Sequence, residues 1–207
     1  MKFYLSSYKI GNETEKLKEL IPENNKCGYI PNALDFTKAD PERRKKHMDS
    51  DRQALNEVGF KVEVLDLKEY FGRPNELQKK MSELGAVWVS GGNTFVLRQA
   101  MKISGFDEIL KGLVERQDFL YAGYSAGCCI LAPSLKCLQI VDDPNDMPYK
   151  QIKETIWKGL GLIDYVILPH YASEHSESKD IDKEVQYCID NKILFKALKD
   201  GEVIIIE

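Results

Sequence analysis

Residues 119–131 read FLYAGYSAGCCIL, and this stretch indicates the fold class and the candidate chemistry together. The apolar run 119–122 predicts a strand, and residues 126–131 predict the start of a helix that Pro133 ends. Between them lies the pattern Gly-x-Ser-x-Gly at residues 123–127. A serine on a sharp turn from strand to helix exposes its hydroxyl, so Ser125 is a candidate nucleophile.

The pattern itself is short, and at ordinary residue frequencies roughly one chain in fifteen of this length would contain it by chance. Its position between a predicted strand and a predicted helix supports a catalytic role more strongly than the pattern alone does. A helix that begins after Ser125 directs its first N–H groups, and the positive end of its dipole, toward the place where an oxyanion would form. The alternative interpretation is a tight turn in which the serine only caps the helix.

Apolar patterns typical of strands and of helices alternate along the rest of the chain. We expect strands at 3–6, 27–30, 61–67, 86–89, 119–122 and 165–168, and helices at 13–21, 41–58, 75–84, 94–103, 106–116 and 181–189. Residues 138–141 form a possible further strand. Residues 195–198 and 203–206 predict a closing hairpin around the Asp-Gly pair 200–201. This alternation predicts an α/β fold with a mostly parallel sheet and helices on both faces.

Functional groups of such sheets gather outside the carboxyl ends of the strands. Three predicted strands end in unusual residues: Gly91-Gly92-Asn93, the serine turn 123–127, and Pro169-His170. We therefore expect these three segments to meet at one edge of the sheet.

A serine hydroxyl needs a base, and histidine is the usual one. The chain has three. His170 follows a predicted strand and is the candidate base, whereas His47 lies in a charged helix and is expected to be solvated. His175 is expected at the surface. The acid that orients the base stays open between Asp146 and Asp200, with Glu174 and Glu177 as further carboxylates near His170.

Composition narrows the class of protein. The 207 residues favour one domain, 1–207, and a net charge of -4 speaks against a nucleic-acid partner. The basic cluster 43–46 is interpreted as a solvated helix face. No apolar run approaches the ~20 residues that cross a membrane, and the N-terminus does not resemble a signal peptide, so we expect a cytoplasmic protein. The five cysteines form no C-x-x-C pair, which favours buried free thiols over a metal site.

Five ordered segments resemble the peptidase E family of serine peptidases, which includes aspartyl dipeptidase and is related to cyanophycinase. They are residues 30–33 (IPNA), 89–95 (VSGGNTF), 123–127 (GYSAG), 145–148 (NDMP) and 168–171 (LPHY). The resemblance implies a flavodoxin-like three-layer sandwich related to class I glutamine amidotransferases. Those enzymes carry a cysteine at the nucleophile position, so Ser125 indicates the serine-peptidase branch.

The resemblance also implies roles for single residues. Ser125 would be the nucleophile and His170 the base. Asp200, before Gly201, matches the position of the family's third residue, a glutamate in aspartyl dipeptidase, and Asp146 is the alternative acid. The N–H groups of Gly92 and Ala126 would form the oxyanion hole. Two further residues would line the site, namely Gly91 and Asn93.

Small peptides, including dipeptides with an acidic N-terminal residue, are the substrates that the resemblance implies. They would be cleaved through an acyl-enzyme without metal or cofactor. Where aspartyl dipeptidase is rich in arginine after its histidine, residues 171–179 contain one lysine and two glutamates. This difference weakens the expectation of an Asp-specific pocket. We expect a monomer or homodimer.

Two other classes of protein also fit the sequence. An esterase of the α/β-hydrolase type would use Asp146 as its acid. A non-catalytic amidotransferase-like protein would bind a small molecule without using Ser125 and His170 together.

Overall fold

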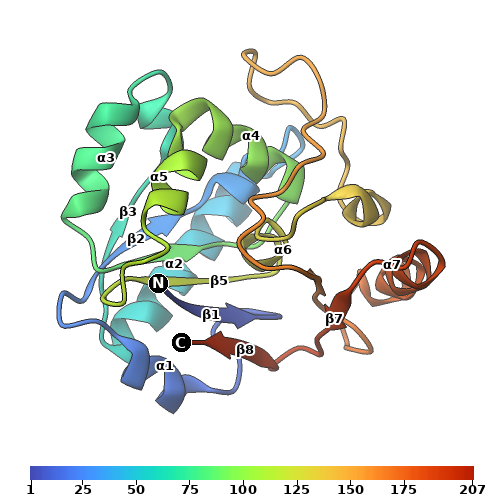
Figure 1. Ribbon diagram of the computed structural model, residues 1–207, viewed down its shortest axis with the longest axis horizontal. Coiled ribbons are helices and arrows are strands. Elements are labelled where there is room, and N and C mark those ends of the chain that lie inside the picture. The colour runs from blue at the N-terminus through green and yellow to red at the C-terminus, as the bar shows by residue number, and fades with distance from the viewer.

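The structure is a computed structural model that describes all residues, 1–207. Eight strands and seven α-helices alternate along the chain (Figure 1). The strands are β1 Lys2–Ser6, β2 Lys26–Ile30, β3 Lys61–Val64, β4 Ala86–Val89, β5 Leu120–Tyr124, β6 Val166–Leu168, β7 Phe195–Ala197 and β8 Val203–Ile206. The α-helices are α1 Thr14–Leu20, α2 Pro41–Val58, α3 Pro74–Ser82, α4 Thr94–Ser104, α5 Phe106–Gly112, α6 Ala126–Cys129 and α7 Ser178–Asp190. Three 3₁₀ turns complete the set: η1 Asn32–Leu34, η2 Leu67–Tyr70 and η3 Lys136–Ile140.

Six strands form the central sheet in the order β3-β2-β4-β5-β1-β8. All neighbours are parallel except β8, which runs antiparallel to β1 at the edge. The predicted mostly parallel sheet is confirmed. Strand β5 lies between β4 and β1, so the turn that carries Ser125 leaves the sheet beside the ends of both neighbours.

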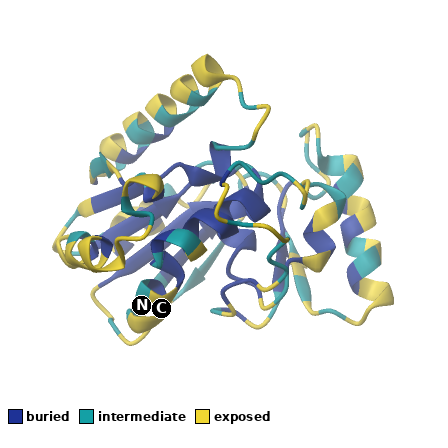
Figure 2. Ribbon diagram, turned by 90° about the horizontal axis from the view of Figure 1, so that it is seen from above, coloured by how far each residue is buried: buried dark blue, intermediate teal, exposed yellow.

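The four inner strands β1, β2, β4 and β5 bury side chains on both faces of the sheet, which explains why these strands are nearly all apolar. Tyr121 and its alternating neighbours pack with α3, α4, α5 and α6 on one face. Ala122 and Tyr124 pack with α1 and α2 on the other. Helices therefore cover both faces (Figure 1), and their outer surfaces are exposed while the inner strands are buried (Figure 2). This is the predicted flavodoxin-like three-layer sandwich.

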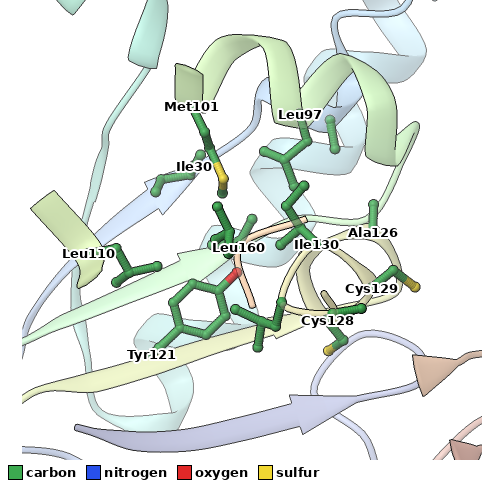
Figure 3. Close-up of a cluster of buried hydrophobic side chains, with 14 of the residues drawn as sticks. Ile30, Leu97, Met101, Leu110, Tyr121, Ala126, Cys128, Cys129, Ile130 and Leu160 are labelled. Carbon is green, nitrogen blue, oxygen red and sulfur yellow. The ribbon is translucent and has the colours of Figure 1, made fainter. Parts of the chain in front are cut away.

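The short helix α6 is fixed to the sheet by the core beneath it. Leu97 and Met101 of α4 pack in the same cluster as Ile130, and Tyr121 points into that cluster from β5 (Figure 3). The hydroxyl of Tyr121 donates to the carbonyl of Gly127 over 2.6 Å. These contacts hold the backbone on both sides of Ser125.

The predicted hairpin of residues 195–198 and 203–206 is wrong. Strand β7 pairs in parallel with β6 in a separate two-stranded sheet, whereas β8 pairs with β1. The Asp-Gly turn does form, with Gly201 at φ 96° and Glu202 N–H donating to Lys199 O over 2.9 Å. It connects two different sheets because the otherwise open edge of β1 supplies backbone partners for β8.

Other differences are local. Residues 138–141 do not form a strand, because 136–140 turn into η3. The strand predicted at 61–67 ends at Val64, since Asp66 caps η2 by accepting from Lys68 N–H over 3.0 Å. Helix α5 ends at Gly112, earlier than the predicted residue 116. No helix combines the length and the apolar character needed to span a lipid bilayer.

Candidate active site

The backbone of Ser125 is strained. Its φ is 48° and its ψ is -118°, a conformation that costs non-glycine residues about 1–3 kcal/mol. Its carbonyl accepts hydrogen bonds from Cys128 and Cys129 N–H over 2.8 and 3.0 Å and so begins α6. Its side chain makes no capping hydrogen bond. The interpretation of Ser125 as a capping serine is therefore incorrect for its hydroxyl, which lines a cavity instead.

The glycines of this turn are required by close packing. A Cβ on Gly127 would lie 2.3 Å from the carbonyl oxygen of Val89, and one on Gly123 would lie 2.6 Å from it. A Cβ on Gly91 would meet the ring of Tyr124 at 2.7 Å. The end of β4 thus touches the serine turn directly, as the sequence predicts for neighbouring strand ends.

Two backbone N–H groups are candidates for the oxyanion hole, those of Gly92, which lines the same cavity as Ser125, and of Ala126, the next residue in the chain. Gly92 has a φ of 138°, and its N–H forms no hydrogen bond within the protein. Ala126 is the first residue of α6, so its N–H has no partner in the helical ladder. Asn93 also lines the cavity, but its side chain caps α4 by accepting from Phe95 and Val96 N–H over 2.8 and 3.0 Å.

His170 follows β6 and is almost fully buried, with 2% of its surface exposed. Its Nδ1 lies 2.7 Å from Oδ1 of Asp200. A carboxylate can only accept, so Nδ1 carries the proton and Nε2 is left with its lone pair. Ser7, directly after β1, fixes both partners: its Oγ accepts from the N–H of His170 over 2.9 Å and donates to Asp200 over 3.1 Å.

The pKa of His170 is lowered below the usual 6.5, chiefly because the ring is buried. The hydrogen bond to Asp200 opposes this effect, and the neighbouring His175 adds to it. His175 is not a simple surface residue as predicted. Its ring stacks on that of His170 with centroids 3.8 Å apart and planes 10° apart. A lowered pKa favours the neutral form of the ring, which is the form that could accept a proton from a serine.

Ser125 and His170 line one cavity of about 820 Å³. It is bounded by the segment that enters α2, the ends of β4 and β5, the loop 141–147 and the loop after β6. No hydrogen bond joins Ser125 Oγ to His170, and catalytic hydrogen bonds commonly tighten only when substrate binds.

Asp146 also lines this cavity, but both of its oxygens bind Thr37. The backbone N–H of Thr37 donates to Oδ2 over 3.0 Å, and its hydroxyl donates to Oδ1. Asp146 thus ties the loop 141–147 to the segment before α2, while Asp200 contacts His170.

One prediction about α2 is wrong. His47 is half-buried and lines the cavity, where its Nε2 contacts the hydroxyl of Tyr124. That hydroxyl donates to the buried Asp51 over 2.8 Å. The basic cluster is a largely solvated helix face as predicted, since Arg43, Lys45 and Lys46 are exposed; Arg44 alone is half-buried and pairs with Asp35 over 2.7 Å. The position of Tyr124 directly before Ser125 was the one sequence feature that could have indicated that His47, its partner, reaches the site.

The ligand atoms of His170, His175 and Glu177 lie within 4.8 Å of one another. This cluster is poorly arranged for a metal ion. Asp200 already occupies Nδ1 of His170, and parallel stacked rings direct their nitrogens side by side instead of toward one ion.

A strained serine at a strand end, a buried histidine and its carboxylate in one cavity are typical of hydrolytic enzymes with a serine nucleophile. Comparison with known proteins agrees. Residues 6–207 match Peptidase family S51, and the chain belongs to this family. The predicted family and the peptidase function are confirmed, which favours a peptidase over the esterase and the non-catalytic binding protein.

Individual relatives show low sequence identity to this chain. An uncharacterized peptidase of Listeria monocytogenes is 29% identical over 182 residues, which cover 83% of this chain and 82% of the relative. A probable alpha-aspartyl dipeptidase of Drosophila melanogaster is 30% identical over 128 residues, which cover 62% of this chain and 48% of the relative. The crystal structure of a candidate peptidase E from Listeria monocytogenes superposes with a TM-score of 0.75, at 23% identity, over 100% of this chain and 98% of the other. At that identity the superposition supports the fold alone.

Proposed function

We propose that this peptidase cleaves short peptides through an acyl-enzyme on Ser125, with His170 as the base and Asp200 as the residue that orients it. The observation that carries the proposal is the 2.7 Å contact between Nδ1 of His170 and Asp200. It leaves Nε2 unprotonated in the cavity that Ser125 lines.

The chemistry follows from these positions. Nε2 of His170 accepts the proton of Ser125 Oγ while the oxygen attacks the peptide carbonyl carbon. The N–H groups of Gly92 and Ala126 would receive the oxyanion. His170 then gives its proton to the leaving amine as the C–N bond breaks. Water adds to the ester carbon in the same way, and Ser125 recovers its proton.

Short substrates fit the charges at the α2 side of the cavity. Lys38 and Arg43 both line it, and neither forms an ion pair. A carboxylate of a short peptide, at its C-terminus or on an acidic side chain, would find cations there. These residues lie outside segment 171–179, where the arginines of aspartyl dipeptidase would be expected.

Labelling with a fluorophosphonate probe tests the nucleophile. The wild type is expected to be modified at Ser125 and to lose peptidase activity in step with labelling. Ser125→Ala is expected to remain unlabelled and to lose at least about 10⁴-fold in kcat, as for other serine hydrolases without their nucleophile. Equal labelling of both proteins, or an unlabelled but active wild type, would refute the assignment.

The pH dependence of labelling tests the base. His170 must be neutral to accept a proton, so the labelling rate falls as pH falls through its pKa. Because burial lowers this pKa, the midpoint of the fall is expected below pH 6.5. The probe carries no amino group, so the profile reports the enzyme. A midpoint above pH 7 would contradict the proposed state of His170.

We also propose a cytoplasmic location and a single domain over residues 1–207. All five cysteines are buried free thiols, which suits a reducing compartment. One cluster of 39 buried residues draws on the central sheet, α4, β6 and α7, which supports one folding unit. Monomer or homodimer stays a prediction.

A further inference from the structure

A second histidine ring lies flat on the ring of His170. The ring of His175 is almost parallel to it, with centroids 3.8 Å apart and planes 10° apart. Both residues line the large cavity together with Ser125. Tyr8 packs its ring against both imidazoles, with centroids 5.8 Å away in each case. The structure thus places a second ring in direct contact with the base, and the reaction proposed above gives that ring no part.

The loop after β6 is bent so that this contact can form. His170 adopts φ 61° and Ala172 adopts φ 48°, and these two left-handed residues turn the chain back over itself. Non-glycine residues keep such conformations only where the surrounding structure fixes them. Ser173 of the same loop accepts a hydrogen bond from the N–H of Asp200 over 2.8 Å. One strained loop therefore positions both the stacked ring and the acid.

The other contacts of His170 leave its ring free to tilt. Nδ1 is held by Oδ1 of Asp200 over 2.7 Å, and the backbone N–H is held by Ser7. A hydrogen bond at one atom fixes that atom, but the ring can still rotate about the direction of the bond. Such a rotation would displace Nε2, which lies across the ring from Nδ1. The parallel plane of His175 blocks the rotation on one face of the ring.

His175 itself is not placed to act as a base. Its Nδ1 accepts a hydrogen bond from the backbone N–H of Glu177 over 3.3 Å, so the neutral ring carries its proton on Nε2. The tautomer is the opposite of that in His170, where Asp200 takes the Nδ1 proton and Nε2 keeps its lone pair. The flat face of His175 is therefore the part of the side chain that the site can use.

We propose that His175 is a positioning residue, whose ring holds the ring of His170 at the tilt that directs Nε2 into the cavity lined by Ser125. This proposal rests on the proposed function, because it acts through His170 as the base. It requires a flat ring at position 175 and makes no use of the nitrogen atoms of that ring.

Two substitutions separate the flat face from the nitrogen atoms. His175→Phe keeps a ring that can stack, so kcat for a cleaved dipeptide is expected to stay within about threefold of the wild type. His175→Ala leaves the ring of His170 free to tilt. Its kcat is expected to fall by roughly 10- to 100-fold with little change in KM, the scale of a misplacement of about 1 Å. The rate at which the fluorophosphonate labels Ser125 should fall by the same factor.

Two further variants guard the comparison. His175→Leu fills the space without a flat face, and it is expected to be slower than His175→Phe by roughly 2- to 12-fold, the usual contribution of a ring pair. This pair decides the test if His175→Ala does not fold. Ser176→Ala, at the exposed neighbouring position, is the control and should leave kcat and KM unchanged. Rates are expressed per labelled site, so that a loss of folded protein is not counted as a loss of rate.

The outcomes separate this proposal from the serine mechanism. A labelled wild type with the same kcat in His175→Ala or His175→Leu would overturn the positioning role and leave Ser125 as the nucleophile. A fall in His175→Phe as large as that in His175→Ala would also overturn it, because the nitrogen atoms would then be required. A wild type in which Ser125 is not labelled would instead remove the proposed function.

Discussion

Asp200→Asn is expected to lower kcat by about 10⁴-fold with little change in KM, the loss seen when the acid of a serine triad becomes an amide. The reason lies in the 2.7 Å contact with Nδ1 of His170. An asparagine can offer its NH₂ group to that nitrogen and so stabilise the tautomer with the proton on Nε2. The ring then has no lone pair for Ser125. Steady-state kinetics on a cleaved dipeptide would measure the loss.

Asp146→Asn is the matched control, because both aspartates are predicted candidates for the same role. It should change kcat by less than about tenfold, since Asp146 binds Thr37 and leaves His170 to Asp200. A larger loss in Asp146→Asn than in Asp200→Asn would reverse the two assignments. The fluorophosphonate labelling rate should fall in Asp200→Asn in parallel with kcat.

The elements predicted best are those whose signals are local. Helix α2 begins at Pro41 and ends at Val58 as predicted, because Asp40 accepts from Glu42 and Arg43 N–H and Gly59 adopts φ 124° at the other end. Strand β4 also has its predicted bounds. Strand β8 also has its predicted bounds, but its predicted pairing was wrong, because its partner is β1, almost the whole chain away, and the turn chemistry around Gly201 carries no information on that partner.

The residues of the candidate site fall into the same two groups, those with a local sequence signal and those placed by tertiary packing. Ser125 and His170 were predictable because each follows an apolar strand, but the expectation that both strands belong to one sheet is wrong: β5 lies in the central sheet and β6 in the two-stranded sheet, so the two residues meet through the packing of the two sheets. The choice between Asp146 and Asp200 depends on how two loops fold back, which spacing does not encode. The carboxyl groups of Asp142 and Glu184 come from a loop and a distant helix, and in the sequence each looks like an ordinary surface acid. Glu184 is buried and Asp142 is half-buried, and both line one small pocket with Leu138 and Ile181, a placement that depends on tertiary packing.

Gly127→Ala is expected to destabilise the protein by about 3 kcal/mol or more, at the upper end of the usual cost of overpacking. The added Cβ would lie 2.3 Å from the carbonyl oxygen of Val89, and backbone cannot rotate away as a side chain could. Helix α6 would have to move away from β4, and this movement would displace Ser125 and the N–H of Ala126. For a protein of this size the loss corresponds to a fall in Tm of roughly 6–12 °C.

Gly112→Ala separates packing from helix propensity, because a Cβ there meets no atom within 4 Å and the residue is also helical. It should leave stability unchanged or raise it by up to about 1 kcal/mol. Urea unfolding of both variants would measure the difference. If Gly127→Ala unfolds like the wild type, β4 and α6 must tolerate separation, and the strained turn at Ser125 would not depend on this contact. If it is destabilised but folded, its labelling by the fluorophosphonate should fall as well, since the same shift displaces the nucleophile.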